Sequence, residues 1–64
     1  MSNNFPSRLR SLRLARGLSV SAFATAAGLS RSAVYALEAG KRTPTWATVC
    51  RLANALRVSV EKFR

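Results

Sequence analysis

The stretch from Val20 to Ala39 constrains the fold of this chain more than any other part of its sequence. Two short segments with apolar residues at helical spacing flank a single glycine, Gly28, and Ser30 follows that glycine two positions later. A glycine tolerates the positive φ that ends a helix, and a serine is a favourable N-cap for the next helix. The pattern therefore predicts two short helices that meet at a tight turn, Val20 to Ala27 and Arg31 to Ala39.

This arrangement has the form of a helix-turn-helix motif, whose second helix can enter the major groove of DNA. Phe23 and Ala27 place an apolar stripe on the first helix, and Val34 and Leu37 do so on the second. The small Ala24 allows the two helices to cross closely. The motif thus points to a function as well as to a local fold.

The charge of the chain fits a nucleic-acid partner. Eleven Lys and Arg residues stand against two acidic residues, and the formal net charge is +9. A polyanion is therefore the expected partner. Membrane-active peptides and ribosomal proteins are also basic, so charge alone is weak evidence. The sequence has neither a membrane-spanning apolar run nor a cleavable signal, and we expect a cytoplasmic protein that does not bind membranes.

Helical patterns cover the rest of the chain, and no alternating strand pattern or internal repeat is present. We expect a single domain over residues 1–64, in which residues 1–5 form a flexible arm. Its core is small, and its stability amounts to roughly a few kcal/mol. The predicted fold is all-α with five helices: the two above, one from Pro6 to about Arg16 that Gly17 ends, one after the N-cap Thr45 to about Leu56, and a short last helix after Ser59.

The sequence offers little for catalysis or metal binding. It has no histidine, and its two acidic residues, Glu38 and Glu61, are well separated. The single cysteine, Cys50, lies in an apolar helical stripe and is expected to be a small buried residue. These residues supply neither a nucleophile–base pair nor a cluster of zinc ligands. We therefore predict that the protein is not an enzyme and uses no cofactor or metal.

Several short motifs stand at a characteristic spacing: Leu18-Ser19, Phe23-Ala24, Gly28-Leu29-Ser30, Val34, Leu37-Glu38, Gly40-Lys41, Pro44, and Leu52-Ala53 through Leu56 to Val58-Ser59. Together they resemble the phage repressor and Cro-like family of helix-turn-helix proteins, the XRE type. The resemblance extends from about Leu9 to Phe63. It implies a compact, lambda-repressor-like domain of five helices that binds operator DNA as a dimer and regulates transcription.

The third helix carries the candidate base-reading residues Arg31, Ser32, Tyr35 and Ala36. The guanidinium of Arg31 fits the N7 and O6 acceptors of guanine, although a phosphate contact or a solvated charge would suit it as well. Ser32 can bond to a base or a phosphate, Tyr35 can contact a thymine methyl or a backbone oxygen, and Ala36 offers a methyl group. The family often has polar residues at the positions of Val20 and Ala36. Either the operator is read through Arg31, Tyr35 and DNA shape, or discrimination is low.

The candidate phosphate-binding residues lie at helix starts and in a basic turn. Backbone N–H groups at the starts of the second and third helices, with the hydroxyls of Ser19, Ser21 and Ser30, suit anionic oxygens. The family resemblance implies a second backbone clamp in the turn formed by Lys41, Arg42 and Thr43. The alternative is a basic turn that is only solvated.

The resemblance also implies two structural features. Glu38 would pair with Arg13 of the first helix, either as a partly buried pair that joins two helices or as an exposed pair of little energy. Val58, Val60 and Phe63 would form the dimer interface, although all three could equally belong to the core.

Two residues of the fourth helix region have more than one interpretation. Trp46 is expected to pack at the edge of the core, with a dimer contact as the alternative. Arg57 stands where the family usually has a glycine, so it is expected to adopt a positive φ at a cost of roughly 1 kcal/mol.

The sequence favours a repressor that binds a palindromic operator in double-stranded DNA as a homodimer, with half-sites about 34–36 Å apart. Two other functions stay open at this point. One is an antitoxin-type module that binds a partner protein and its own promoter. The other is a non-specific nucleic-acid binder driven by the positive charge.

Overall fold

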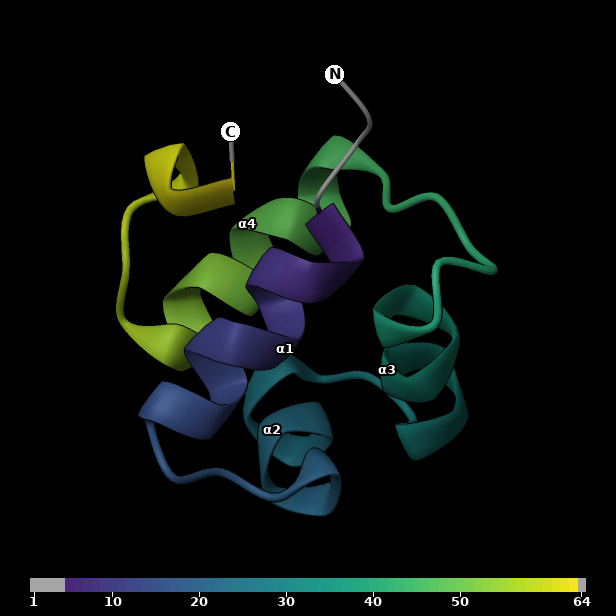
Figure 1. Ribbon diagram of the computed structural model, residues 1–64, viewed down its shortest axis with the longest axis horizontal. Helices are drawn as coiled ribbons and strands as arrows, with labels where there is room; N and C mark the ends of the chain where they lie inside the picture. The colour runs from purple at the N-terminus through teal and green to yellow at the C-terminus, as the bar shows by residue number, and fades with distance from the viewer. Residues whose placement is uncertain (1–4, 64) are drawn as a thin grey trace.

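The computed structural model describes residues 5–63, which form four α-helices and one short 3₁₀ helix (Figure 1). No β-strand occurs within that range. Helix α2 packs against α3 and α4, and α1 packs against α3 and the 3₁₀ helix η1. The predicted all-helical fold is confirmed, with four α-helices and a 3₁₀ turn in place of five helices. The bounds are α1 Phe5–Ala15, α2 Val20–Ala27, α3 Arg31–Glu38, α4 Trp46–Leu56 and η1 Val60–Phe63.

Three of the helices begin at the hydroxyl residues that the sequence predicts as N-caps. Ser19, Ser30 and Thr45 have extended backbones, and the side-chain oxygen of each accepts a hydrogen bond from the amide three residues later. The oxygen-to-nitrogen distances are 3.0, 3.1 and 3.2 Å. Each bond satisfies a backbone donor that the helix itself leaves free, which is worth about 1 kcal/mol. The caps therefore fix where α2, α3 and α4 start.

All four α-helices end with an amide that donates back to the carbonyl five residues earlier. In α2 this bond joins the Leu29 amide to the Ala24 carbonyl at 2.9 Å. The closure requires a residue of positive φ, and Gly28 supplies it with φ 71°. After α4 the same place is taken by Arg57 with φ 57°, the one non-glycine residue of positive φ among residues 5–63. The strained corner predicted at Arg57 is therefore present.

The core lies where the four α-helices meet. Leu9, Phe23, Val34 and Leu52, one from each helix, are fully shielded from water. Burying a side chain of this size contributes roughly 1.5–3 kcal/mol. Because every helix contributes to one cluster, the core fixes α3 relative to α2. The buried apolar cluster comprises Phe5, Leu9, Phe23, Ala24, Ala27, Val34, Leu37, Leu52 and Leu56.

The start of α1 corrects the prediction of an arm over residues 1–5. Phe5 opens the helix and is buried, and its ring centroid lies 5.3 Å from that of Phe63. An aromatic ring that finds such a partner gains more from burial than from exposure. Residues 1–4 lie outside the described residues. Two helices also end one residue earlier than predicted, α1 at Ala15 and α3 at Glu38.

Two side chains expected in or beside the core lie elsewhere. Trp46 is 62% exposed, because the residues of α4 that pack on the core begin only at Val49 and its first turn extends past the other helices. Cys50 is a free thiol that is only half-buried. The first turn of α4 thus precedes the surface that covers the helix, whereas nothing in the structure explains the partial exposure of Cys50, which follows Val49.

Candidate nucleic-acid interface

Helix α3 turns one face to the core and the other to solvent. Its inner face buries Val34 and Leu37, which hold the helix in place. On the outer face Arg31, Ser32 and Tyr35 are exposed, with hydrogen-bonding groups free to meet a ligand. The fourth predicted base-reading residue, Ala36, is half-buried and can offer only part of its methyl group.

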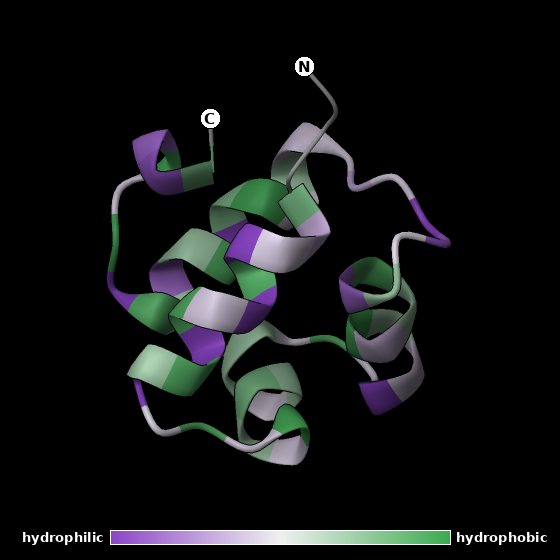
Figure 2. Ribbon diagram, in the orientation of Figure 1, coloured by the Kyte–Doolittle hydropathy of each residue, from purple (hydrophilic) through white to green (hydrophobic). Residues whose placement is uncertain are grey.

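The connection from α3 to α4 extends this polar surface. Lys41, Arg42 and Thr43 are all exposed. The Lys41 amide donates to the Ala36 carbonyl at 2.9 Å, so the turn is held against the last turn of α3. Figure 2 shows strongly hydrophilic residues at the start of α3 and in this connection, on the same side of the domain. Arg31 at the start of α3 and Lys41 and Arg42 beyond its end thus place exposed cations on this side of the domain, which we call the cationic edge.

The hydroxyl groups at the helix starts can bind an anion while they cap their helices. A serine hydroxyl has one donor and two acceptor sites. The Oγ atoms of Ser19 and Ser30 each use one acceptor site on a backbone amide, which leaves the O–H proton free. Ser21 is exposed in the first turn of α2. These groups lie at the starts of α2 and α3. They can therefore contact the phosphate backbone of a nucleic acid that α3 approaches.

The ion pair expected between α1 and α3 is present. Arg13 Nε donates to Glu38 Oε2 at 2.7 Å, and Arg13 Nη2 donates to Glu38 Oε1 at 3.2 Å. The two side chains are only 10% and 9% exposed, and Arg13 Nη1 also donates to the Leu18 carbonyl at 2.8 Å. The hydrogen bonds to Glu38 raise the pKa of the Arg13 guanidinium, against the opposing effect of burial. The pair therefore ties the end of α3 to α1 and to the loop before α2.

The three residues predicted for a dimer interface lie at and before η1. Val58, Val60 and Phe63 are half-buried. Val58 and Phe63 pack on the core cluster, whereas Val60 does not belong to the residues that pack on it. Each keeps an exposed part that a second subunit could cover.

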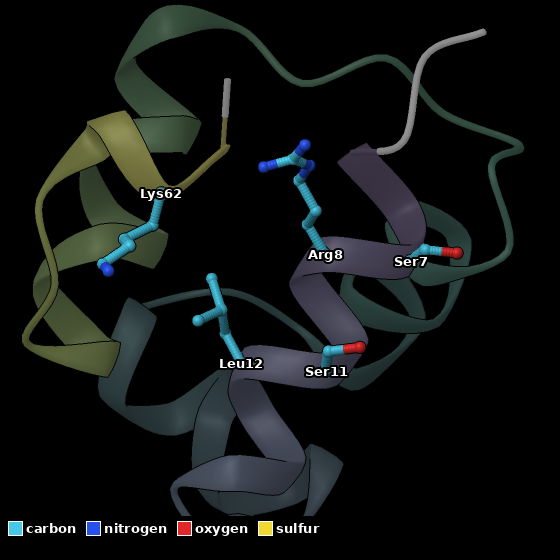
Figure 3. A pocket seen from close by; sticks show the side chains of 5 residues that line it. All are labelled: Ser7, Arg8, Ser11, Leu12 and Lys62. Carbon is cyan, nitrogen blue, oxygen red and sulfur yellow. The ribbon is translucent and has the colours of Figure 1, made fainter.

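An open hollow lies between α1 and η1, across the domain from α3 (Figures 1 and 3). It is lined by Ser7, Arg8, Ser11, Leu12 and Lys62. Arg8, Leu12 and Lys62 extend into it in Figure 3, while the two serines point away. This surface is separate from the cationic edge.

The sequence patterns did not identify the exposed groups around the start of α4. The hydroxyls of Thr45 and Thr48 lie 3.0 Å apart and form a hydrogen bond. Trp46 lies between them in the sequence and is largely exposed. The signal that could have found this surface is the position of all three residues ahead of Val49, the first residue of α4 that packs on the core.

Within residues 5–63 no group of three or more His, Cys, Asp or Glu side chains could hold a metal ion. No helix in the described part of the chain is long and apolar enough to cross a membrane.

Comparison with known sequences and structures gives a consistent result. The family described as a helix-turn-helix domain matches residues 7–64. The chain is 43% identical over 60 residues to the uncharacterized HTH-type transcriptional regulator RghRB of Bacillus subtilis, a match that covers 92% of this chain and 43% of that protein. It is 41% identical over 59 residues to the HTH-type transcriptional repressor RghR of the same organism, covering 91% and 44% of the two chains. The chain thus spans less than half the length of these relatives.

Two solved structures share the fold. The restriction-modification controller protein C.AhdI from Aeromonas hydrophila superposes with a TM-score of 0.93 at 37% identity, covering 97% of this chain and 94% of that one. An HTH_3 family transcriptional regulator from Vibrio cholerae gives a TM-score of 0.91 at 34% identity, covering 95% and 34%. The motif, the exposed face of α3 and these matches agree: the chain belongs to the XRE-like family of helix-turn-helix DNA-binding transcription regulators.

Proposed function

We propose that residues 1–64 act as one domain that binds double-stranded DNA sequence-specifically and represses transcription from a palindromic operator as a homodimer. The exposed face of α3 carries this proposal. Arg31, Ser32 and Tyr35 project from a helix whose other face is fixed in the core, so they are positioned before DNA arrives. An α-helix fits the major groove of DNA, where each base pair presents its own pattern of hydrogen-bond donors and acceptors.

Recognition divides between base contacts and phosphate contacts. Arg31 lies at the start of α3, where a guanidinium can meet guanine N7 and O6. Ser19, Ser21 and Ser30 bind one strand, and Lys41, Arg42 and Thr43 bind the other, which sets the register of α3 in the groove. With so few hydrogen-bonding side chains on α3, DNA shape supplies part of the discrimination.

Dimerisation through Val58, Val60 and Phe63 pairs two copies of α3. The surface is small and only half-buried in one subunit. A two-fold dimer addresses half-sites about 34–36 Å apart, one turn of DNA. The repressor named RghR, to which the chain is 41% identical, supports repression as the direction of control.

Selection of the purified chain against a random duplex pool at near-physiological salt tests the proposal. The expected result is an enriched palindrome whose half-site centres lie about 10 bp apart. Arg31→Ala should relax the preference at one position of each half-site. Lys41→Ala should weaken binding to all duplexes alike and lower the slope of log K against log salt by about one unit.

Binding without any enrichment would contradict sequence-specific regulation and leave a non-specific nucleic-acid binder. An enriched site without symmetry would contradict the dimer but not base recognition.

Control of a restriction-modification system is a second candidate function for the same DNA-binding activity. It is supported by the match to the restriction-modification controller protein C.AhdI, which covers nearly all of both chains. Genes for a restriction endonuclease and a DNA methyltransferase beside the gene for this chain would support it. Deletion of this gene should then change the transcription of those neighbours, and unchanged transcript levels would refute it.

A further inference from the structure

Trp46 is an exposed apolar side chain at the end of the cationic edge. It is the first residue of α4, the single tryptophan of the chain, and 62% exposed. Tryptophan is enriched at interfaces, because its large ring gains from burial while its N–H finds a hydrogen-bond partner. The described residues leave most of the Trp46 side chain uncovered, because the residues of α4 that pack on the core begin only at Val49.

The backbone around Trp46 is held firmly against α3 and α1. Lys41 bonds to the last turn of α3, and a Cβ on Gly40 would lie 3.5 Å from Pro6 Cγ of α1. Pro44 is half-buried, and Thr45 caps α4. Figure 1 shows the connection leaving α3 at the right-hand edge of the domain and continuing to the start of α4. The backbone that carries Trp46 is therefore held in place relative to α3.

The charges near Trp46 indicate which kind of partner its exposed ring contacts. Lys41 and Arg42 are exposed in the same connection, and the described residues near them include no exposed acid. A two-fold contact through Trp46 would bring two such cationic turns together, and like charges at short range repel. A DNA backbone is complementary to both features, because phosphates attract the cations and deoxyribose offers an apolar face.

We propose that Trp46 packs against the sugar–phosphate backbone of the strand beside the major groove that α3 enters. Its ring covers a deoxyribose, and its indole N–H can donate to a phosphate oxygen, while Lys41 and Arg42 hold the adjacent phosphates. Trp46 thereby contributes affinity to every duplex and no base preference. This inference rests on the DNA-binding function proposed above.

Because Trp46 is the single tryptophan, the tryptophan emission reports on the surroundings of this one side chain. The purified chain is titrated with its selected duplex and with a scrambled duplex of equal length, and binding is followed in parallel by the anisotropy of a dye-labelled duplex. We expect the tryptophan emission to change with the same midpoint as the anisotropy. Quenching by acrylamide should fall at least twofold at saturation with either duplex.

Two variants distinguish what the aromatic ring of Trp46 contributes to DNA affinity from what its N–H group contributes. Trp46→Ala should weaken binding about fivefold to tenfold on both duplexes, and Trp46→Phe should keep part of that affinity. Leu14→Ala is the matched control, because Leu14 is 56% exposed on α1, and it should change affinity less than twofold. Circular dichroism checks that each variant keeps the helical content of the parent.

Each remaining result has a distinct meaning. Duplex binding with unchanged emission and an unchanged affinity of Trp46→Ala would overturn the inference and leave the proposed function intact. An emission change that follows protein concentration without DNA would also overturn it, in favour of a contact between subunits. Absence of duplex binding in the anisotropy would overturn the proposed function itself.

Discussion

Replacing Arg13 by methionine should destabilise the domain more than any other single change of an arginine. The substitution keeps an unbranched apolar stem but removes three hydrogen bonds, two to the Glu38 carboxylate and one to the Leu18 carbonyl. It leaves the Glu38 carboxylate, 9% exposed, without its partner. Stranding one member of a buried pair costs about 3–5 kcal/mol, and the pair lies near enough to the surface that we expect about 3 kcal/mol.

For a domain of this size that loss lowers the melting temperature by about 12–24 °C. It also approaches the whole free energy of unfolding, which a core this small rarely raises above about 5 kcal/mol. Urea and thermal unfolding should be followed by far-ultraviolet circular dichroism, because the exposed Trp46 is a poor fluorescence probe of unfolding. Arg10→Met, an exposed arginine of the same helix, is the control and should change the free energy of unfolding by less than about 0.5 kcal/mol.

The double variant Arg13→Met/Glu38→Leu should recover at least about 1.5 kcal/mol relative to Arg13→Met, because it leaves no charge unpaired. Since the pKa of Arg13 is raised in the folded state, the contribution of its guanidinium charge is lost as the solution becomes strongly alkaline. Equal stability of Arg13→Met and Arg10→Met would refute the reasoning.

Three further changes test other parts of the fold. Arg57→Gly should stabilise the domain by about 0.5–1 kcal/mol by relieving the positive φ after α4, and a lower melting temperature would show that the corner is not strained. Ser30→Ala should lower the free energy of unfolding by about 1 kcal/mol through loss of the α3 N-cap, whereas Ser21→Ala should be near neutral because Ser21 caps no helix. Chemical denaturation of the two variants measures the difference. Val60→Lys should abolish dimerisation in analytical ultracentrifugation without changing the melting temperature, and an unchanged dimer would remove η1 from the interface.

The parts of the fold that could be predicted are those controlled by local chemistry. Gly28 permits one backbone conformation that few residues adopt, and Ser19, Ser30 and Thr45 mark helix starts by hydrogen bonds to nearby amides. Such signals act within a few residues, so α2 is predicted to the residue. The Arg13–Glu38 pair joins residues 25 positions apart, and only the family resemblance indicated it.

The sequence could not show which apolar side chains are exposed, because exposure depends on where one helix stops covering another. Trp46 continues the apolar stripe of α4, but burial depends on the length of the neighbouring helices, which periodicity does not contain. Phe5 was predicted to lie in a flexible arm but is buried. Its partner Phe63 lies at the far end of the chain, so local patterns do not reveal the contact. Ala36 has helical spacing typical of the reading face and is nonetheless half-buried.

The most direct test of sequence reading by α3 is an isotope-filtered nuclear Overhauser spectrum of the labelled domain bound to its selected duplex. The account predicts contacts between the side chains of Arg31, Ser32 or Tyr35 and major-groove protons such as thymine methyl or cytosine H5, with sugar protons contacted by the residues around them. Contacts of α3 with sugar protons alone, or base contacts made by another helix, would contradict it.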